Sequence, residues 1–154
     1  MRYCERHDSK KKERGRLMNS VNNVDMNELF KSVRVIAVVG LSNDSGRPSF
    51  GVAAYLQRAG YRIIPVNPSV AEILGEKSYA SLRDIPEHVD VVDVFRKSDA
   101  VGPIAEDAVA IGATYLWLQE GVIHPEAATM ACKAGLQVVM DRCILKEHRA
   151  LGKV

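Results

Sequence analysis

The sequence has no long hydrophobic run and no paired cysteines, and each absence excludes a class of protein. No apolar segment approaches the roughly 18 residues that a membrane-spanning helix needs. The charged N-terminus is not followed by the apolar segment of a secretory signal. Cys4, Cys132 and Cys143 are odd in number and form no C-x-x-C pair, which disfavours a disulfide framework and a thiolate zinc site. We expect a cytoplasmic protein with reduced thiols, no membrane contact and no metal site.

The sequence also lacks a basic stripe outside its N-terminal segment. Residues 1–26 hold seven Lys and Arg against four Asp and Glu, which leaves 14 against 15 for the remaining residues. Nucleic-acid binding by the folded part is therefore disfavoured. Residues 1–25 are polar and show no sustained apolar periodicity, so we expect a flexible basic extension there. Residues 26–154 are then long enough for a single ligand-binding domain.

Strand and helix patterns alternate along this domain. The predicted strands are 35–39, 61–66, 89–95, 114–118 and 136–140. The predicted helices are 27–31 after a cap at Asp25, 48–59, a segment from a cap at 98–99 to 111, 125–134 and 143–151, with a short helical turn at 81–85. This alternation predicts an α/β fold with a Rossmann-like, doubly wound, parallel five-stranded sheet in the strand order 3-2-1-4-5. Ligands of such sheets bind at the carboxyl ends of the strands, near the first strand where the order reverses.

The most informative motif is the apolar strand 35–39, which ends at Gly40 and opens into a polar loop. A strand, a small-residue turn and a helix N-terminus form an anion site, because backbone N–H groups and the helix dipole converge there. The dinucleotide fingerprint is incomplete, since Ser42 replaces its second glycine, and a P-loop does not fit. Ser42 and Ser49 can donate hydrogen bonds to a phosphate, and Arg47 can pair with it bidentately. A solvated surface turn is the alternative interpretation.

The end of the second strand decides which nucleotide fits. An NAD site needs Asp or Glu there to hold the ribose hydroxyls, whereas this chain has Asn67 and Pro68. Neutral Asn67 does not repel a phosphate, and Pro68 offers a rigid wall for an adenine. NAD is therefore disfavoured and a 3′-phosphorylated adenosine is tolerated, although a loop without a ligand fits the same residues.

Further candidates follow the later strands. Arg96, after Phe95, can reach the first loop and contact a diphosphate, while a solvated arginine fits equally well. Gln119 can face the same crevice. His124 precedes a proline at a helix start, which favours a capping role.

A second group of residues has the side-chain types of a nucleophilic catalytic site. It consists of Asp141, Cys143 and His148. The spacing of Cys143 and His148 does not by itself place a base beside the thiol, so a catalytic triad is disfavoured.

Five motifs in combination resemble those of the small, stand-alone CoA-binding domain proteins. They are A-V-V-G-L-S at 37–42, G-Y-R with P-V-N-P at 60–68, D-V-V-D-V-F-R at 90–96, L-W-L-Q-E-G at 116–121 and V-M-D-R-C at 139–143. The resemblance covers about residues 27–151 and extends to the CoA-binding half of succinyl-CoA synthetase and of nucleotide-forming acyl-CoA synthetases. It implies a Rossmann-like fold that binds coenzyme A, with the diphosphate at the first loop. The residues implied in binding are Gly40, Leu41, Ser42, Arg47, Ser49, Asn67, Pro68, Phe95, Arg96 and Gln119.

The resemblance also bears on catalysis. The related ligases need a domain with a phosphorylated histidine and an ATP-grasp module, and these 154 residues hold neither, so we expect no ligation by this chain alone. The leading hypothesis is a cytoplasmic protein that binds CoA or an acyl-CoA as a carrier, sensor or accessory subunit. One alternative is a CoA-dependent transferase or thiol enzyme that uses Cys143. Another is a nucleotide-responsive regulator whose basic tail docks a partner or nucleic acid.

Overall fold

The computed structural model describes residues 20–152, and its elements follow the predicted alternation. The main strands are β1 (Val35–Val39), β2 (Arg62–Val66), β5 (Val91–Val94), β6 (Tyr115–Leu118) and β7 (Gln137–Val139). The α-helices are α2 (Met26–Ser32), α3 (Pro48–Arg58), α4 (Val101–Ala110), α5 (Pro125–Lys133) and α6 (Ile144–Ala150), and the short 3₁₀ turns are η1 (Leu82–Asp84) and η2 (Ser98–Ala100). The α/β class and the five main strands are confirmed. A small hairpin of β3 (Glu72–Ile73) and β4 (Glu76–Lys77) was not predicted.

The sheet is parallel and five-stranded, with the order β2-β1-β5-β6-β7, so the predicted order 3-2-1-4-5 is wrong. The third predicted strand, β5, pairs with β1 on the side opposite β2. The connection from β2 to β5 contains the β3–β4 hairpin and η1 in place of an α-helix, and it returns past β1. The strand order still reverses beside β1, now between β1 and β5.

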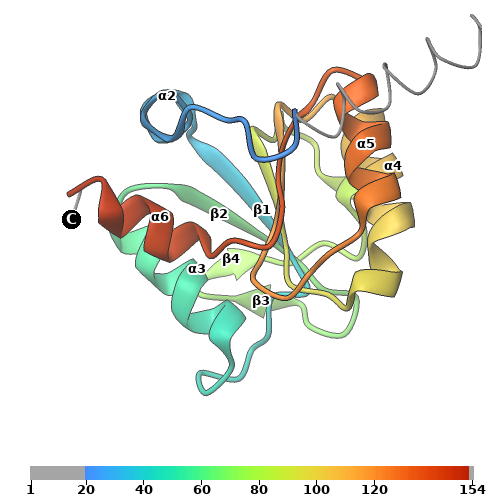
Figure 1. Cartoon of the computed structure of the whole chain (residues 1–154). Coiled ribbons are helices and arrows are strands. Elements are labelled where there is room, and N and C mark those ends of the chain that lie inside the picture. The colour runs from blue at the N-terminus through green and yellow to red at the C-terminus, as the bar shows by residue number, and fades with distance from the viewer. Residues whose placement is uncertain (1–19, 153–154) are drawn as a thin grey trace, which may run out of the picture.

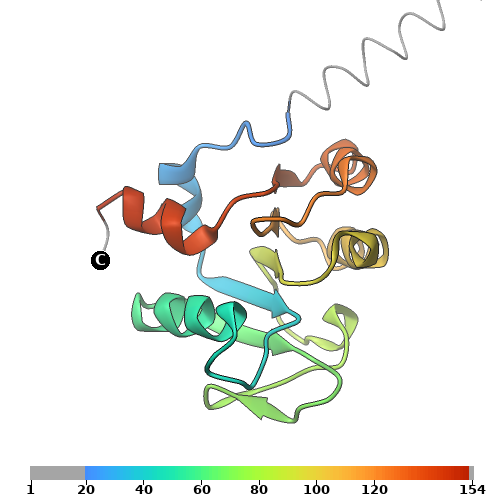
Figure 2. The ribbon, with the colours of Figure 1, turned by 60° about the horizontal axis from the view of Figure 1, so that its bottom comes forward.

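Helices cover both faces of the sheet, as a doubly wound fold requires (Figure 1). α2, α3 and α6 pack on one face, and η1, α4 and α5 pack on the other. Right-handed crossovers that run in opposite directions along a sheet place their connections on opposite faces, which accounts for the two layers. Figure 2 shows these layers on either side of the strands.

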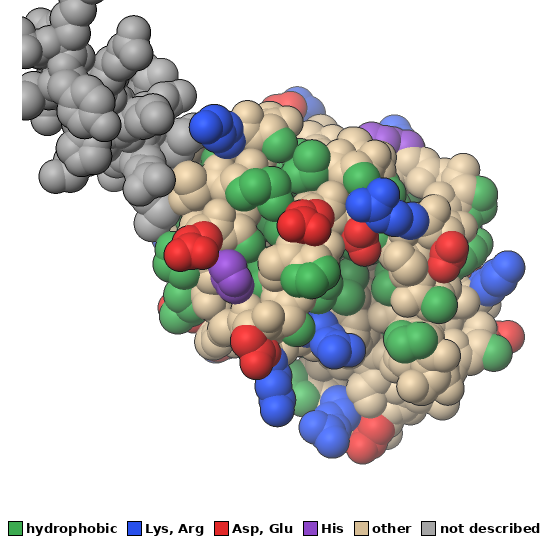
Figure 3. Space-filling model, turned by 90° about the vertical axis from the view of Figure 1, so that its right-hand side faces the viewer, with side chains coloured by type: hydrophobic (Ala, Val, Ile, Leu, Met, Phe, Trp, Pro, Cys, Tyr) green, Lys and Arg blue, Asp and Glu red, His purple; other side chains and the backbone are tan. Residues whose placement is uncertain are grey.

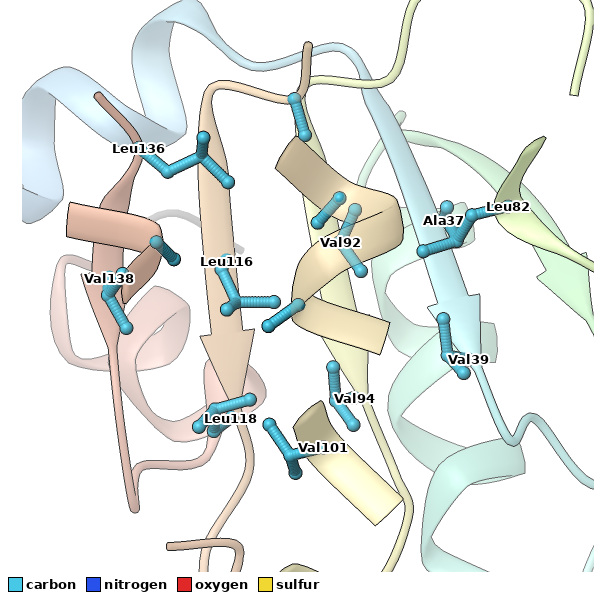
Figure 4. Packing of buried hydrophobic residues seen from close by; sticks show 14 of the residues in the cluster. Ala37, Val39, Leu82, Val92, Val94, Val101, Leu116, Leu118, Leu136 and Val138 are labelled. Atoms are coloured by element: carbon cyan, nitrogen blue, oxygen red, sulfur yellow. The ribbon is translucent and has the colours of Figure 1, made fainter. Parts of the chain in front are cut away.

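The strands are mostly apolar because each one is largely buried on both faces. Val92 and Val94 of β5 and Leu116 and Leu118 of β6 point into the layer of α4 (Figure 4). The alternate residues point the other way, toward α3 and α6. Asp93 interrupts this second set, as a carboxylic acid in the centre of the sheet.

Two predicted helix caps are confirmed. The carboxylate of Asp25 accepts a hydrogen bond from the N–H of Glu28 at 3.2 Å, at the start of α2. Nδ1 of His124 accepts one from the N–H of Ala127 at 3.0 Å, at the start of α5. The predicted cap of α4 at 98–99 is wrong, because the turn η2 occupies these residues and the helix begins after it.

The N-terminal segment follows the edge of β7. The N–H of Asn22 donates to the carbonyl of Val138 at 2.8 Å. The Asn22 amide also exchanges two hydrogen bonds with the backbone of Met140, at 2.6 and 3.0 Å. The predicted extension therefore has its last residues, 20–25, against the sheet, while its residues 1–19 lie outside the described part of the chain.

The surface over α4 and α5 carries charges of both signs. Acidic and basic side chains are interspersed on this face, and neither kind forms a continuous patch (Figure 3). Within residues 20–152, no helix combines the length and the apolar character needed to cross a membrane.

Candidate ligand-binding cleft

A cleft of about 980 Å³ lies at the carboxyl ends of β1, β2, β5 and β6. This volume is in the range of clefts that hold small organic ligands. Nine of the ten predicted binding residues line it: Gly40, Ser42, Arg47, Ser49, Asn67, Pro68, Phe95, Arg96 and Gln119. The side chain of Leu41 does not, because it is fully buried in the layer of α3.

Gly40 allows the ends of β1 and β5 to approach each other. Its φ of +84° is a backbone conformation that favours glycine. A Cβ at this position would collide with the carbonyl oxygen of Phe95 and lie 2.9 Å from Cδ of Arg96. The glycine therefore brings the loop after β1 directly against the loop after β5.

The loop between β1 and α3 is closed by its own serines. The N–H of Ser42 donates to the hydroxyl of Ser49 at 3.0 Å, and the N–H of Asp44 donates to the hydroxyl of Ser42 at 3.0 Å. The α3 helix begins at Pro48 with no acidic residue in its first turn and no side-chain cap. No side chain at the cap position or in the first turn neutralises the positive end of the helix dipole, which suits an anion.

The cleft carries unpaired positive charge. Arg47 and Arg96 are exposed on its wall, and neither forms an ion pair with a described carboxylate. Two carboxylates of the wall are neutralised by cations: Asp107 pairs with Arg83 at 2.7 Å, and Glu120 pairs with Lys146 at 2.8 Å. The two free guanidinium groups beside the N-terminus of α3 make this part of the cleft attractive to phosphates.

Asn67 joins the loops that follow β1 and β2. Its Nδ2 donates to the carbonyl of Leu41 at 3.0 Å, and its Oδ1 accepts from the N–H of Ser69 at 2.9 Å. An aspartate could not make the first of these bonds, because a carboxylate has no proton to donate. The residue that replaces the ribose-binding acid of NAD sites thus has a structural task of its own.

Gln119 connects the cleft to a buried acid. It is 4% exposed, lines the cleft and donates from Nε2 to Oδ1 of Asp93 at 2.5 Å. Asp93 is fully buried, and this desolvation raises the pKa of its carboxyl to about 7, although the hydrogen bond from Gln119 opposes the shift. The sequence signal for Asp93 was an acid inside an otherwise apolar strand.

The cleft also has an apolar wall, which the sequence patterns did not predict. This wall consists of Leu82, Ala100, Ile104 and Val122, from η1, η2, α4 and the loop after β6. The sequence predicted a helix in this segment, but it could not show that the cleft opens beside Ile104.

The structure does not favour a catalytic triad at the end of the sheet. Cys143 lines the cleft, but the ring of His148 packs edge-on against Phe30, and its Nδ1 lies 2.8 Å from the hydroxyl of Tyr55. The carboxylate of Asp141 accepts a hydrogen bond from the backbone at residue 121. Within residues 20–152, no three His, Cys, Asp or Glu side chains gather as a metal site.

Comparisons with known proteins show the family to which the chain belongs. A family model described as a CoA binding domain matches residues 34–149. The chain is 39% identical over 131 residues to the uncharacterized protein YneT of Bacillus subtilis (strain 168), an alignment that covers 85% of this chain and 97% of that protein. The solved structure of a hypothetical protein from Pyrococcus horikoshii OT3 has a TM-score of 0.81 and 38% identity, covering 82% of this chain and 89% of that chain.

A shorter similarity connects the chain to much larger enzymes. It is 39% identical over 69 residues to the ADP-forming acetate–CoA ligase II of Archaeoglobus fulgidus, covering 44% of this chain and 10% of the ligase. The family resemblance predicted from the five motifs is confirmed. The chain belongs to the CoA-binding domain family and is related to one part of the ADP-forming acetate–CoA ligases.

Proposed function

We propose that the protein binds coenzyme A or an acyl-CoA in the cleft and has no catalysis of its own. In this proposal it acts as a carrier, sensor or accessory subunit in the cytoplasm, with residues 26–154 as the binding domain. The ten residues implied by the family resemblance are the proposed contacts, with Leu41 contributing through its backbone.

One observation supports the proposal above the others. Arg47 at the N-terminus of α3 and Arg96 beside Gly40 line the cleft where the strand order reverses, and neither has a carboxylate partner among residues 20–152. The dipole of α3, the hydroxyls of the two loop serines and the two arginine side chains together suit a diphosphate. Doubly wound sheets bind their ligands at this position.

The end of β2 supports CoA over NAD. Asn67 has no negative charge, and both ends of its amide are used to join two loops. Residues 67–71, directly after β2, contain no carboxylate to hold the ribose hydroxyls of NAD or to repel the 3′-phosphate of CoA. Pro68 lines the cleft next to Asn67 and is the proposed wall for the adenine.

The absence of catalysis is proposed from the contacts of the polar residues. His148 and Asp141 both have structural partners, so Cys143 is left without an evident base among the described residues. The similarity to the acetate–CoA ligase spans 10% of that enzyme, so its ligase activity is not assigned to this chain.

The test compares thermal unfolding of the full chain with CoA, NAD and ATP at equal concentrations, with a thiol reductant present. A ligand that binds only the folded state stabilises it by about 2.7 kcal/mol at about 100 times its Kd. We expect CoA to raise Tm and NAD to leave it unchanged. A rise with NAD and none with CoA would contradict the proposal.

A thiol enzyme is the second candidate, because Cys143 lines the same cleft. A catalytic cysteine reacts as the thiolate and is alkylated rapidly near neutral pH, whereas a structural cysteine is inert. The rate of iodoacetamide alkylation, compared between wild-type protein and Cys143→Ala, shows whether Cys143 behaves as a catalytic or as a structural cysteine. Fast modification that depends on Cys143 favours the enzyme.

A further inference from the structure

Asp93 is a carboxylic acid in the centre of the sheet, and it contacts a residue of the cleft. It is 0% exposed and lies between Val38 of β1 and Trp117 of β6. Its Oδ1 accepts the hydrogen bond from Gln119, while its Oδ2 is the one buried side-chain polar atom of residues 20–152 without a hydrogen-bond partner. Such an atom lowers stability, so packing does not explain why an acid stands here.

The hydrogen bond determines how the Gln119 amide is oriented. A primary amide carries its donor nitrogen and its acceptor oxygen on different sides. Nε2 is held by Asp93, and Gln119 lines the cleft. Its Oε1 is therefore the atom left to accept a hydrogen bond from a ligand.

Gln119 lies at one end of the cleft. The strand order places the loops along the edge of the sheet in the sequence β2, β1, β5, β6. Asn67 and Pro68 therefore stand at the opposite end, with Arg47 and Arg96 between. Adjacent strands are about 4.8 Å apart, so the ends of β2 and β6 are separated by roughly 14 Å. A ligand with its nucleoside at Pro68 and its diphosphate at the arginines extends its remaining arm toward Gln119.

We propose that Asp93 is a positioning residue, which holds Gln119 so that Oε1 accepts a hydrogen bond from an amide N–H in the non-nucleotide arm of the ligand. This inference rests on the proposed function and specifies which part of CoA Gln119 recognises. The pantetheine arm of CoA contains secondary amides, whose N–H groups match the free oxygen of Gln119. Adenosine 3′,5′-bisphosphate shares the nucleotide half of CoA but lacks this arm.

The test measures the Kd of CoA and of adenosine 3′,5′-bisphosphate by calorimetry for the full chain and its variants. Asp93→Leu releases the Gln119 amide, and Gln119→Met removes its oxygen with little change in volume. We expect each variant to bind CoA about tenfold more weakly and the bisphosphate within about twofold of wild type. Asp93→Asn keeps an acceptor oxygen, so its affinity for CoA should stay within about twofold.

Two further variants separate positioning from a general loss of structure. The double variant Asp93→Leu/Gln119→Met should lose no more CoA affinity than Gln119→Met alone, because Asp93 acts through Gln119. Asp90→Ala is the matched control, because Asp90 directly precedes β5 and its carboxylate accepts hydrogen bonds from the backbone N–H groups of residues 34 and 35, at 3.0 and 2.9 Å. The Asp90→Ala protein should be less stable than wild type, with unchanged Kd values for CoA and for the bisphosphate.

The results distinguish a failure of the positioning role of Asp93 from a failure of the proposed CoA binding. Equal losses for CoA and the bisphosphate, or full CoA affinity in Gln119→Met, would overturn the role of Asp93 and leave the proposed function intact. Wild-type protein that binds neither ligand would overturn both. If Asp93→Leu does not fold, Gln119→Met and Asp93→Asn still give these answers.

Discussion

Gly40 packs directly against the backbone of Phe95, and no larger residue fits between the ends of β1 and β5. A Cβ on Gly40 would collide with the carbonyl oxygen of Phe95, and the φ of +84° disfavours any other residue. This contact brings together the two loops that carry Arg47 and Arg96.

Gly40→Ala should therefore be strongly destabilising. The left-handed backbone and the collision together cost roughly 2–4 kcal/mol. The free energy of unfolding in urea measures the loss. Gly51→Ala is the matched control, since Gly51 lies in α3 and an added Cβ meets nothing within 4 Å. That variant should be neutral or more stable by up to about 1 kcal/mol. Equal stability of both variants would show that the close approach of the strands is unimportant.

Arg47→Ala should weaken CoA binding without a large effect on stability. Arg47 is exposed and has no described carboxylate partner, so its guanidinium is free for a phosphate. Loss of a hydrogen bond to a charged group costs about 1.5–3 kcal/mol, which calorimetry detects as a weaker Kd. Arg58→Ala, at the other end of the same helix, is the control that should bind like wild type. If the two variants bind CoA equally well, the diphosphate does not lie at Arg47.

Asn67→Asp should reduce both stability and CoA affinity. The carboxylate cannot donate to the carbonyl of Leu41, and it adds a negative charge beside the proposed phosphate site. The broken bond costs about 1–2 kcal/mol in the free energy of unfolding. Asn23→Asp places the same charge at an exposed position in the N-terminal segment and should change neither property. A stable Asn67→Asp protein that gains affinity for NAD would contradict the structural role of Asn67.

The sequence predicted the elements well because each strand and helix carries its own local pattern. The run at 35–39 matches β1 residue for residue, and the capping roles of Asp25 and His124 follow from local chemistry. The strand order depends on how the connection 67–90 crosses the sheet. The mixed pattern of that segment does not show on which side of β1 the chain returns, so the order was predicted wrongly.

The site was predictable as a set of loops, but its internal bonds were not. Once the strands are parallel, the residues that follow β1, β2, β5 and β6 must meet at the same edge of the sheet. That Asn67 reaches Leu41, and that Gln119 reaches Asp93, depends on contacts 26 residues apart in the chain. No local pattern encodes such contacts.

The buried carboxyl of Asp93 should give the protein a distinctive pH dependence. Its pKa is raised from 3.8 to about 7 by desolvation, so the folded state keeps a proton that the unfolded state loses above about pH 4. The contribution of Asp93 to stability therefore falls as pH rises from about 4 to about 7, and it stays constant above that range.

Asp93→Asn removes this titration while keeping the shape of the side chain. The free energy of unfolding of the variant, relative to wild type, should increase by about 2–3 kcal/mol from about pH 5 to about pH 8.5. The free energies of unfolding of both proteins are measured in urea at both pH values. The other titratable groups contribute equally to both proteins, so they cancel in the difference between variant and wild type. A difference between variant and wild type that does not change with pH would contradict a neutral Asp93 in the folded state.

Binding of CoA in the cleft is tested most directly by a calorimetric titration of the reduced, full-length protein with CoA and, separately, with NAD. We expect saturable binding of CoA at one site per chain, weaker in Arg47→Ala, and no measurable binding of NAD. Saturable binding of NAD with no heat from CoA would contradict this expectation.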